Sequence, residues 1–125
     1  MFGNIATAQA EAAQAGLMIR DLPEGSLWSL AGLGRAQLPM NMLSIALGGG
    51  VRVGLEDNIW FDDERTRLAS NLDLIRRIHD LAEIRGRKVM TPGELRAKLQ
   101  LAPGFGDYGI AAHPKEVSSV ATRED

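Results

Sequence analysis

The residues best suited to chemistry lie close together in the sequence VRVGLEDN, near the middle of the chain. This run predicts a short strand over residues 51–56. Because successive side chains of a strand point to opposite faces, Arg52, Gly54 and Glu56 are expected to share one face, and the apolar residues the other. Charged groups on a buried face are costly, and they usually remain because they bind a ligand, a metal or each other. Arg52 and Glu56, followed directly by Asp57, therefore form a candidate binding site.

The end of this strand is also where such a site is expected. In open α/β sheets and in barrels, active sites lie at the carboxyl ends of the strands, and Asp57 and Asn58 follow that end. Gly54 removes side-chain bulk and leaves room for a substrate. The residues alone leave two other interpretations open, since Arg52 and Glu56 could form a structural ion pair inside the sheet or could face solvent on an edge strand. A single carboxylate is likewise a weak metal signal, because a site needs three or four ligands.

The elements that position this stretch begin with a helix and a strand. Alanine-rich residues 4–20 predict a helix capped by Asn4. The short apolar run at residues 26–33 predicts a buried strand. Residues 37–47 predict a second helix, which three glycines end. Its buried face is expected to consist of apolar residues at helical spacing, namely Leu38, Met42 and Ile45.

Two further helices are predicted after the second strand. Ser70 with Asp73 resembles a capping box at the start of a helix over residues 70–85. Its buried stripe is expected to be formed by Leu72, Ile75, Leu81 and Ala82. Its solvated face is expected to carry the arginines Arg76, Arg77 and Arg85. A second capping box, in the sequence TPGE, opens a helix over residues 91–99, and the composition of residues 102–125 predicts a disordered tail.

The order of these elements indicates an α/β fold. Strands that alternate with helices over short connections are parallel and are joined by right-handed crossovers. Two parallel strands cannot by themselves make a stable sheet that is covered on both faces. The chain is therefore expected to be incomplete or to need partners.

Composition and charge exclude several classes of protein. The 125 residues are enough for one ordinary domain, and 45% of them are hydrophobic, which suffices for a packed core. The net charge of -2 argues against a nucleic-acid-binding protein, and the absence of cysteine excludes disulfides and thiolate metal sites. The sequence shows no signal peptide and no apolar run that could span a membrane, so a cytoplasmic protein with no nucleic-acid or membrane partner is expected.

The sequence GGGVRVGLEDNIW resembles the signature of the β-keto acid cleavage enzymes. The resemblance extends over roughly residues 22–101, and it includes the sequences SLWSLAGLGRAQLPMNMLSIALGGG before the signature and LASNLDLIRRIHDLAEIRGRKVMTPGELRAKL after it. It covers most of this chain but only roughly the last third of a family member. It implies that residues 1–101 are the C-terminal part of a TIM (β/α)8 barrel, with residues 26–33 as the seventh strand and residues 51–56 as the eighth.

The resemblance also implies an activity and a set of site residues. Family members transfer an acyl group from a β-keto acid to acetyl-CoA, releasing acetoacetate and a new acyl-CoA, and they bind a divalent metal, typically zinc. Carried over to this sequence, Glu56 is implied as the carboxylate ligand of the metal, and Arg52 and Asp57 as the catalytic pair near the reacting carbonyl. Arg52 would hold a carboxylate or a developing oxyanion. Asp57 would either orient Arg52 or assist proton transfer.

Two departures separate this chain from the family pattern. The family's other metal ligands are two histidines in a His-x-His pattern, whereas His79 lies within a predicted helix and His113 in the predicted tail. Gly50 stands where many members have histidine. One carboxylate is not a metal site, so we expect an inactive C-terminal fragment, completed in the enzyme by a homo-oligomer or by the missing N-terminal portion of the barrel. The alternatives are a subunit of a split enzyme, and a non-catalytic interaction module that pairs with itself through exposed apolar faces.

Overall fold

The computed structural model describes residues 1–101, which fall into two units, one spanning Met1–Val89 and a second that begins at Met90. The tail predicted at residues 102–125 lies outside the described residues. In the second unit, α4 (Pro92–Lys98) begins at the predicted capping box, in which the Thr91 hydroxyl accepts from the Glu94 amide and the Glu94 carboxylate accepts from the Thr91 amide. Within residues 1–101, no helix has the length and apolar composition needed to cross a bilayer.

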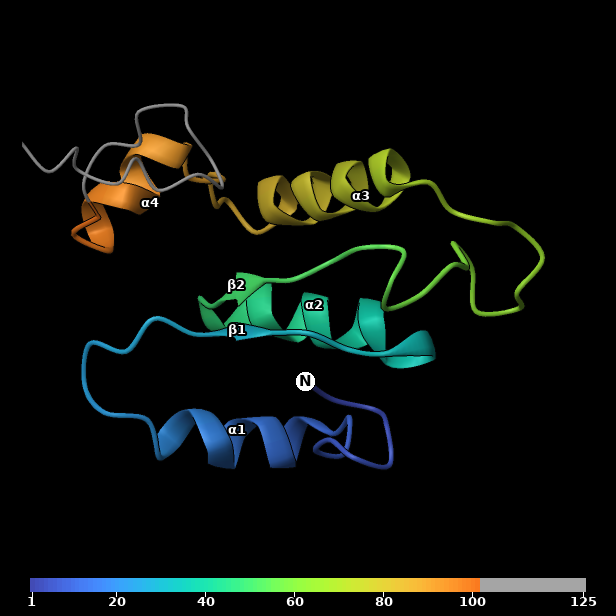
Figure 1. Ribbon diagram of the computed structural model, residues 1–125, viewed down its shortest axis with the longest axis horizontal. Helices are drawn as coiled ribbons and strands as arrows, with labels where there is room; N and C mark the ends of the chain where they lie inside the picture. The colour runs from blue at the N-terminus through green and yellow to red at the C-terminus, as the bar shows by residue number, and fades with distance from the viewer. Residues whose placement is uncertain (102–125) are drawn as a thin grey trace, which may run out of the picture. The chain divides into compact units, whose positions relative to one another are not determined.

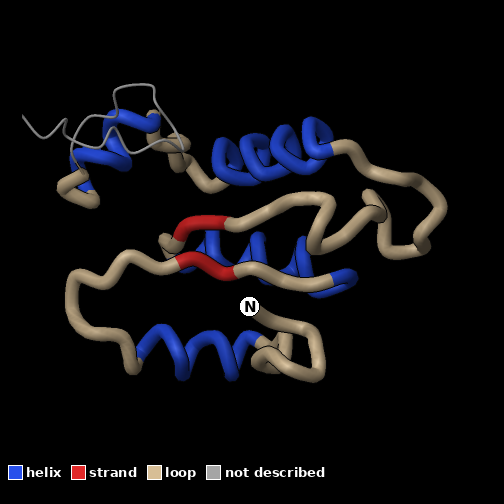
Figure 2. Tube along the Cα trace, viewed as in Figure 1, coloured by secondary structure: helices blue, strands red, loops and turns tan. Residues whose placement is uncertain are grey.

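Two short parallel strands lie at the centre of the first unit. In the register of β1 (Ser29–Leu30) and β2 (Gly50–Val51), Ser29 lies opposite Gly50. Helix α2 (Gln37–Leu47) joins the two strands and packs against both (Figure 1). The predicted α/β order with parallel strands is therefore confirmed. Both strands are shorter than predicted, because a strand extends only as far as a neighbour can pair with its backbone, and the flanking residues are loop (Figure 2).

The beginning of the chain supplies a third parallel neighbour instead of a helix. The Phe2 amide donates to the Ala31 carbonyl at 2.8 Å, and the Leu33 amide donates to the Phe2 carbonyl at 2.9 Å. Phe2 thereby forms a parallel bridge with Gly32, just beyond β1. The segment around Phe2, then β1, then β2 are neighbours in the order in which they occur along the chain.

The helix predicted over residues 4–20 is therefore wrong in its first half. Asn4 begins a tight turn, in which its carbonyl accepts from the Thr7 amide at 3.0 Å, and α1 begins only at Ala12 and ends at Arg20. Long-range pairing of the Phe2 backbone overrides the helix propensity of the alanines around it. Helix α1 packs onto the strands through a core cluster made of Phe2, Ala15, Leu30 and Met40.

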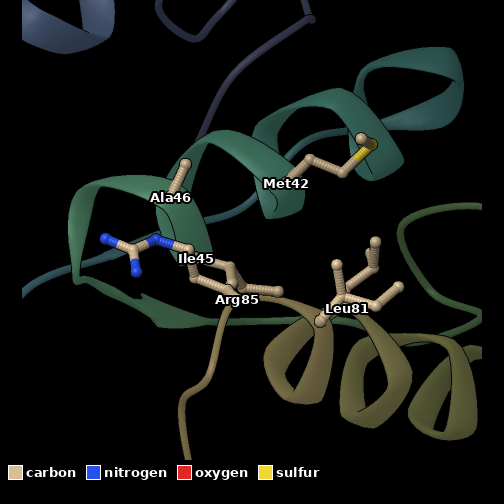
Figure 3. A pocket seen from close by; sticks show the side chains of 6 residues that line it. Met42, Ile45, Ala46, Leu81 and Arg85 are labelled. Atoms are coloured by element: carbon tan, nitrogen blue, oxygen red, sulfur yellow. The ribbon is translucent and has the colours of Figure 1, made fainter.

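Helix α3 (Asn71–Ile84) begins at the predicted capping box, because the Ser70 hydroxyl accepts from the Asp73 amide at 3.1 Å. The predicted buried stripe is wrong in the first half of this helix, where Leu72 and Ile75 are exposed and Leu74 is only 1% exposed. Helix α3 packs against α2, and the two helices border an apolar hollow of about 180 Å³ (Figure 3). The hollow is lined by Met42, Ile45, Ala46, Leu81, Ile84 and Arg85.

Arg87 ties the end of α3 to the end of α2. Its guanidinium donates to the carbonyls of Ile45 at 3.0 Å, Gly49 at 2.9 Å and Gly48 at 3.1 Å. These carbonyls lie at the C-terminus of α2, where the helix leaves backbone acceptors without partners and a cation is favourable. Gly48 itself has a φ of 93°, which a glycine adopts at little cost and which ends the helix as predicted.

The capping box of α3 predicts a pH dependence of stability. Hydrogen bonds from the Ser70 hydroxyl and amide lower the pKa of Asp73 below its ordinary value of 3.8. Since the folded pKa is the lower one, this carboxylate contributes stability that is fully present above 3.8 and is lost as the pH falls through the folded value. We expect Asp73→Asn to destabilise the chain at neutral pH and to lose this part of the acid dependence. Urea denaturation from neutral to acidic pH measures both effects, and parallel pH profiles for the variant and the wild type would contradict the assignment.

Candidate functional site

The predicted site residues lie just after β2, with Arg52 next to the strand and Glu56 and Asp57 in a turn at residues 54–57. The strand predicted over residues 51–56 ends at Val51, and the chain then turns so that the Gly54 carbonyl accepts from the Asp57 amide at 3.2 Å. The expectation that Arg52, Gly54 and Glu56 alternate along one strand face is therefore wrong, because the backbone is not extended to Glu56. The turn nevertheless brings the side chains of Arg52, Glu56 and Asp57 together.

Arg52 contacts both neighbouring carboxylates. One terminal nitrogen of its guanidinium lies 3.1 Å from Asp57 Oδ1 and 3.4 Å from Glu56 Oε1. The side chain of Asp57 is 2% exposed, whereas those of Arg52 and Glu56 are 49% and 63% exposed. The buried carboxylate of Asp57 thus holds the Arg52 guanidinium from the protein side. The side chains of Arg52 and Glu56 remain accessible to a ligand.

The second oxygen of Asp57 has no hydrogen-bond partner in the part of the chain that the structure describes, although it is buried. A buried carboxylate oxygen without a partner costs free energy, and such atoms in native structures call for a specific explanation. One explanation is a role at a reacting centre, which is consistent with the position of Asp57 at the carboxyl end of a parallel strand.

Three other elements hold the turn at residues 54–57 in place. The Gln37 side-chain amide donates to the Gly54 carbonyl at 2.8 Å, and the Leu55 amide donates to the side-chain oxygen of Asn71 at 3.0 Å. The Gly34 amide donates to the Asp57 carbonyl at 2.7 Å. These contacts come from the start of α2, the start of α3 and the 3-10 helix η1 (Gly34–Ala36) that follows β1, so the turn is held by three elements.

Sequence reasoning missed these contacts because it followed only the apolar residues of α2. The face of α2 that is buried against the strands carries three polar residues at helical spacing, Gln37, Asn41 and Ser44, each at most 2% exposed. Of the residues predicted to form its buried face, Ile45 is buried, Leu38 is half-buried and Met42 is exposed. The signal available in the sequence was this second, polar stripe, which runs beside the apolar one.

The loop after the turn is an ordered hairpin that stacks two arginines on one ring. The Phe61 amide donates to the Arg67 carbonyl at 2.9 Å, and the guanidinium carbons of Arg67 and Arg77 lie 4.1 Å and 3.9 Å from the centre of the Phe61 ring. Burial lowers the pKa of Arg77, whose side chain also donates to the Phe61 carbonyl at 2.8 Å. The prediction that Arg77 lies on a solvated face is therefore wrong, since this arginine anchors the hairpin to α3.

The described residues supply part of a metal site at most. No three of the His, Asp and Glu side chains in residues 1–101 form a group that could hold a metal ion. His79 is exposed on α3, as predicted, and His113 lies outside the described residues. Glu56 fits the role of one ligand, because its exposed carboxylate is of the type that binds divalent cations. The remaining ligands would have to come from other residues.

A hollow of about 510 Å³ is lined by Arg35, Asp63 and Glu64. None of the three predicted site residues lines it. The candidate site is therefore defined by the Arg52–Asp57 ion pair and by the hydrogen bonds that hold the turn at residues 54–57, and not by this hollow.

Comparisons with known proteins all find similarity to one group of enzymes. A family model described as beta-keto acid cleavage enzyme matches residues 1–101. The chain is 45% identical over 84 residues to a 3-keto-5-aminohexanoate cleavage enzyme of Fusobacterium nucleatum, covering 67% of this chain and 30% of the relative. It is 42% identical over 83 residues to a 3-oxoadipate:acetyl-CoA acetyltransferase of Cupriavidus necator, covering 66% of this chain and 29% of the relative.

A third relative is named for a different reaction. The chain is 33% identical over 84 residues to a 3-dehydrocarnitine:acetyl-CoA trimethylamine transferase of Rhizobium meliloti, covering 67% of this chain and 27% of the relative. The matched region spans less than a third of the length of each of these three curated relatives.

Proposed function

The chain belongs to the beta-keto acid cleavage enzyme family, and from this premise we propose that it supplies the Arg52–Asp57 pair of an enzyme that transfers an acyl group from a β-keto acid to acetyl-CoA. The observation that carries the proposal is the 3.1 Å contact between Arg52 and the buried Asp57 on the turn that follows β2. The names of the relatives, a 3-keto-5-aminohexanoate cleavage enzyme and a 3-oxoadipate:acetyl-CoA acetyltransferase, support the reaction class.

The complete enzyme would be a TIM barrel, of which this chain provides the C-terminal part. The support is topological, since the Phe2 segment, β1 and β2 are parallel neighbours in chain order with a helix between each pair, as in successive units of such a barrel. A barrel has eight strands. The remaining strands would complete the sheet next to β2 and would enclose the turn at residues 54–57.

In the proposed reaction, the bond between the keto carbon and the adjacent methylene of the β-keto acid breaks. The methylene joins the acetyl carbon of acetyl-CoA, and the coenzyme A sulfur passes from that acetyl carbon to the keto carbon. The products are acetoacetate and a new acyl-CoA, so that no oxidant or further reactant is needed.

Arg52 and Asp57 have complementary parts in this proposal. The half-exposed guanidinium of Arg52 would bind the substrate carboxylate or a developing oxyanion through charge-assisted hydrogen bonds. Asp57 Oδ1 holds the guanidinium from behind and fixes its direction. The unpartnered Oδ2 leaves Asp57 a second capacity, which is to accept a proton.

Glu56 would contribute one carboxylate to a divalent metal, which we propose to be zinc. When bound, such a metal polarises the keto group as a Lewis acid. With one ligand supplied by this chain, we expect the chain alone to bind zinc weakly.

The test is reconstitution of activity. We expect the purified chain alone to form no acetoacetate from acetyl-CoA and a panel of β-keto acids with zinc. Co-expression with the part of the Fusobacterium nucleatum relative that the chain does not match should give acetoacetate, because the barrel is then complete.

The positive control is the relative expressed as two pieces that are divided at the same place. If this control forms acetoacetate and the pair containing our chain forms none, the proposed function is wrong. Turnover by the chain alone would contradict the proposal that the site needs residues from elsewhere.

A further inference from the structure

The face of α2 that is buried against the strands makes hydrogen bonds to the segment that carries the site. We propose that Gln37 is a positioning residue, whose side-chain amide holds the turn at residues 54–57 so that Asp57 meets Arg52 in the productive direction. The inference rests on the proposed function for its consequence in catalysis, but the geometry it describes can be measured without any turnover.

The Gly54 carbonyl is the point on which the turn depends. It accepts from the Asp57 amide at 3.2 Å, the upper end of the usual range, and from the Asn58 amide at 3.4 Å, which is beyond it. The third and shortest bond, at 2.8 Å, comes from Gln37. Gln37 therefore makes the shortest bond to the Gly54 end of the turn, and the Gly34 amide, at 2.7 Å from the Asp57 carbonyl, holds the other end.

Gln37 is suited to this role because it cannot easily be replaced by water. The residue is 2% exposed and lies at the first position of α2, and that helix is anchored by the core residue Met40. A side chain with its helix fixed in this way holds its amide in one place, whereas a water molecule would follow the movements of the turn.

A second residue of the same helix holds the other end of the segment. The Ser44 hydroxyl donates to the Gly50 carbonyl and accepts from the Leu30 amide at 3.2 Å.

The segment from Gly50 to Gly54 is thus held at both ends by side chains of one helix. Arg52 is its middle residue, and its guanidinium reaches Asp57 just beyond the Gly54 end. Loss of the Gln37 contact would release the Gly54 end of the turn, while the Ser44 contact keeps the beginning of β2 in place and the Gly34 amide keeps the Asp57 carbonyl in place. The expected defect is thus a change in the Arg52–Asp57 geometry.

The experiment compares Gln37→Met with Ile45→Val in the full chain. Gln37→Met keeps the length of the side chain and removes the donor. Ile45→Val removes one methylene from the same helix at a buried position and leaves the Gln37 hydrogen bond to the turn unchanged. Thermal unfolding of both variants establishes that each one is folded.

The first readout is the NMR signal of the Arg52 side-chain Nε–H group. We expect this signal in Gln37→Met to move to the position that it takes in Asp57→Asn, where the ion pair is lost. In Ile45→Val it should stay at the wild-type position. If Gln37→Met does not fold, Gln37→Asn, which withdraws the amide by one methylene and keeps a polar group, takes its place with the same expectation.

The second readout is kcat in the reconstituted enzyme, where we expect a fall of about 10²-fold for Gln37→Met, since a small misplacement near reacting groups can cost that much. Ile45→Val should stay within about threefold of the wild type. An unchanged Arg52 signal in the folded Gln37 variant, or an equal shift in Ile45→Val, would overturn the inference. If reconstitution gives no activity for the wild type, the proposed function fails, and the NMR comparison still decides the positioning role.

Discussion

Replacing Asp57 with asparagine is expected to lower kcat of the reconstituted enzyme by about 10²-fold or more. Asparagine has nearly the same shape, so the turn should keep its fold. It lacks the charge that holds the Arg52 guanidinium at 3.1 Å, and it cannot accept a proton at the position of the unpartnered Oδ2. Both roles that the geometry allows for Asp57 are therefore lost in one substitution.

The matched control is Asp21→Asn, because Asp21 also pairs with an arginine. Arg20 Nη2 lies 2.9 Å from Asp21 Oδ1, and the two side chains are 69% and 66% exposed. Surface pairs of this kind contribute little to stability, and we expect Asp21→Asn to keep the wild-type kcat. Initial rates of acetoacetate formation measure both variants, and equal rates for Asp57→Asn and the wild type would remove Asp57 from the site.

The largest expected loss of stability follows from Leu74→Ala. Leu74 is 1% exposed, and its side chain is among the largest that are fully buried in the described part of the chain. Truncation of a fully buried leucine costs about 3 kcal/mol through lost burial and the cavity that remains. Since small domains are stable by only about 5 to 15 kcal/mol, this loss should lower the urea midpoint substantially.

Leu72→Ala provides the comparison on the same helix. Leu72 is 53% exposed, so the same truncation should cost less than about 1 kcal/mol. Urea denaturation followed by circular dichroism gives both values. A larger loss at Leu72 than at Leu74 would mean that α3 buries the face that its sequence pattern predicted, and that the observed packing of this helix is wrong.

The sequence predicted those elements of the fold whose bounds are set by residues close to them in the chain. The bounds of α2, the glycine that ends it and both capping boxes were predicted, because each is set by residues within one turn of the helix. The strand bounds and the first half of the helix at residues 4–20 were not. Backbone pairing of Phe2 with residues distant in sequence decides the structure there, and local propensity carries no information about it.

The candidate site shows the same division. The positions of Arg52, Glu56 and Asp57 near the end of a strand could be expected from the sequence, and the structure brings these side chains together. The turn that brings them together could not be expected, because it depends on donors and acceptors from three other elements, above all Gln37 and Asn71. A polar residue on a buried helix face becomes informative only when the group that it contacts is known.

The central claim is that Arg52 and Asp57 act as one unit, and a double-mutant comparison tests it most directly. The kcat of Arg52→Lys/Asp57→Asn is measured in the reconstituted enzyme beside the two single variants. Residues that act together give strongly non-additive losses, so the double variant should lose no more than about threefold beyond the worse single variant. If the two losses instead multiply, the residues act independently, and the pair 3.1 Å apart at the end of β2 is not the functional unit.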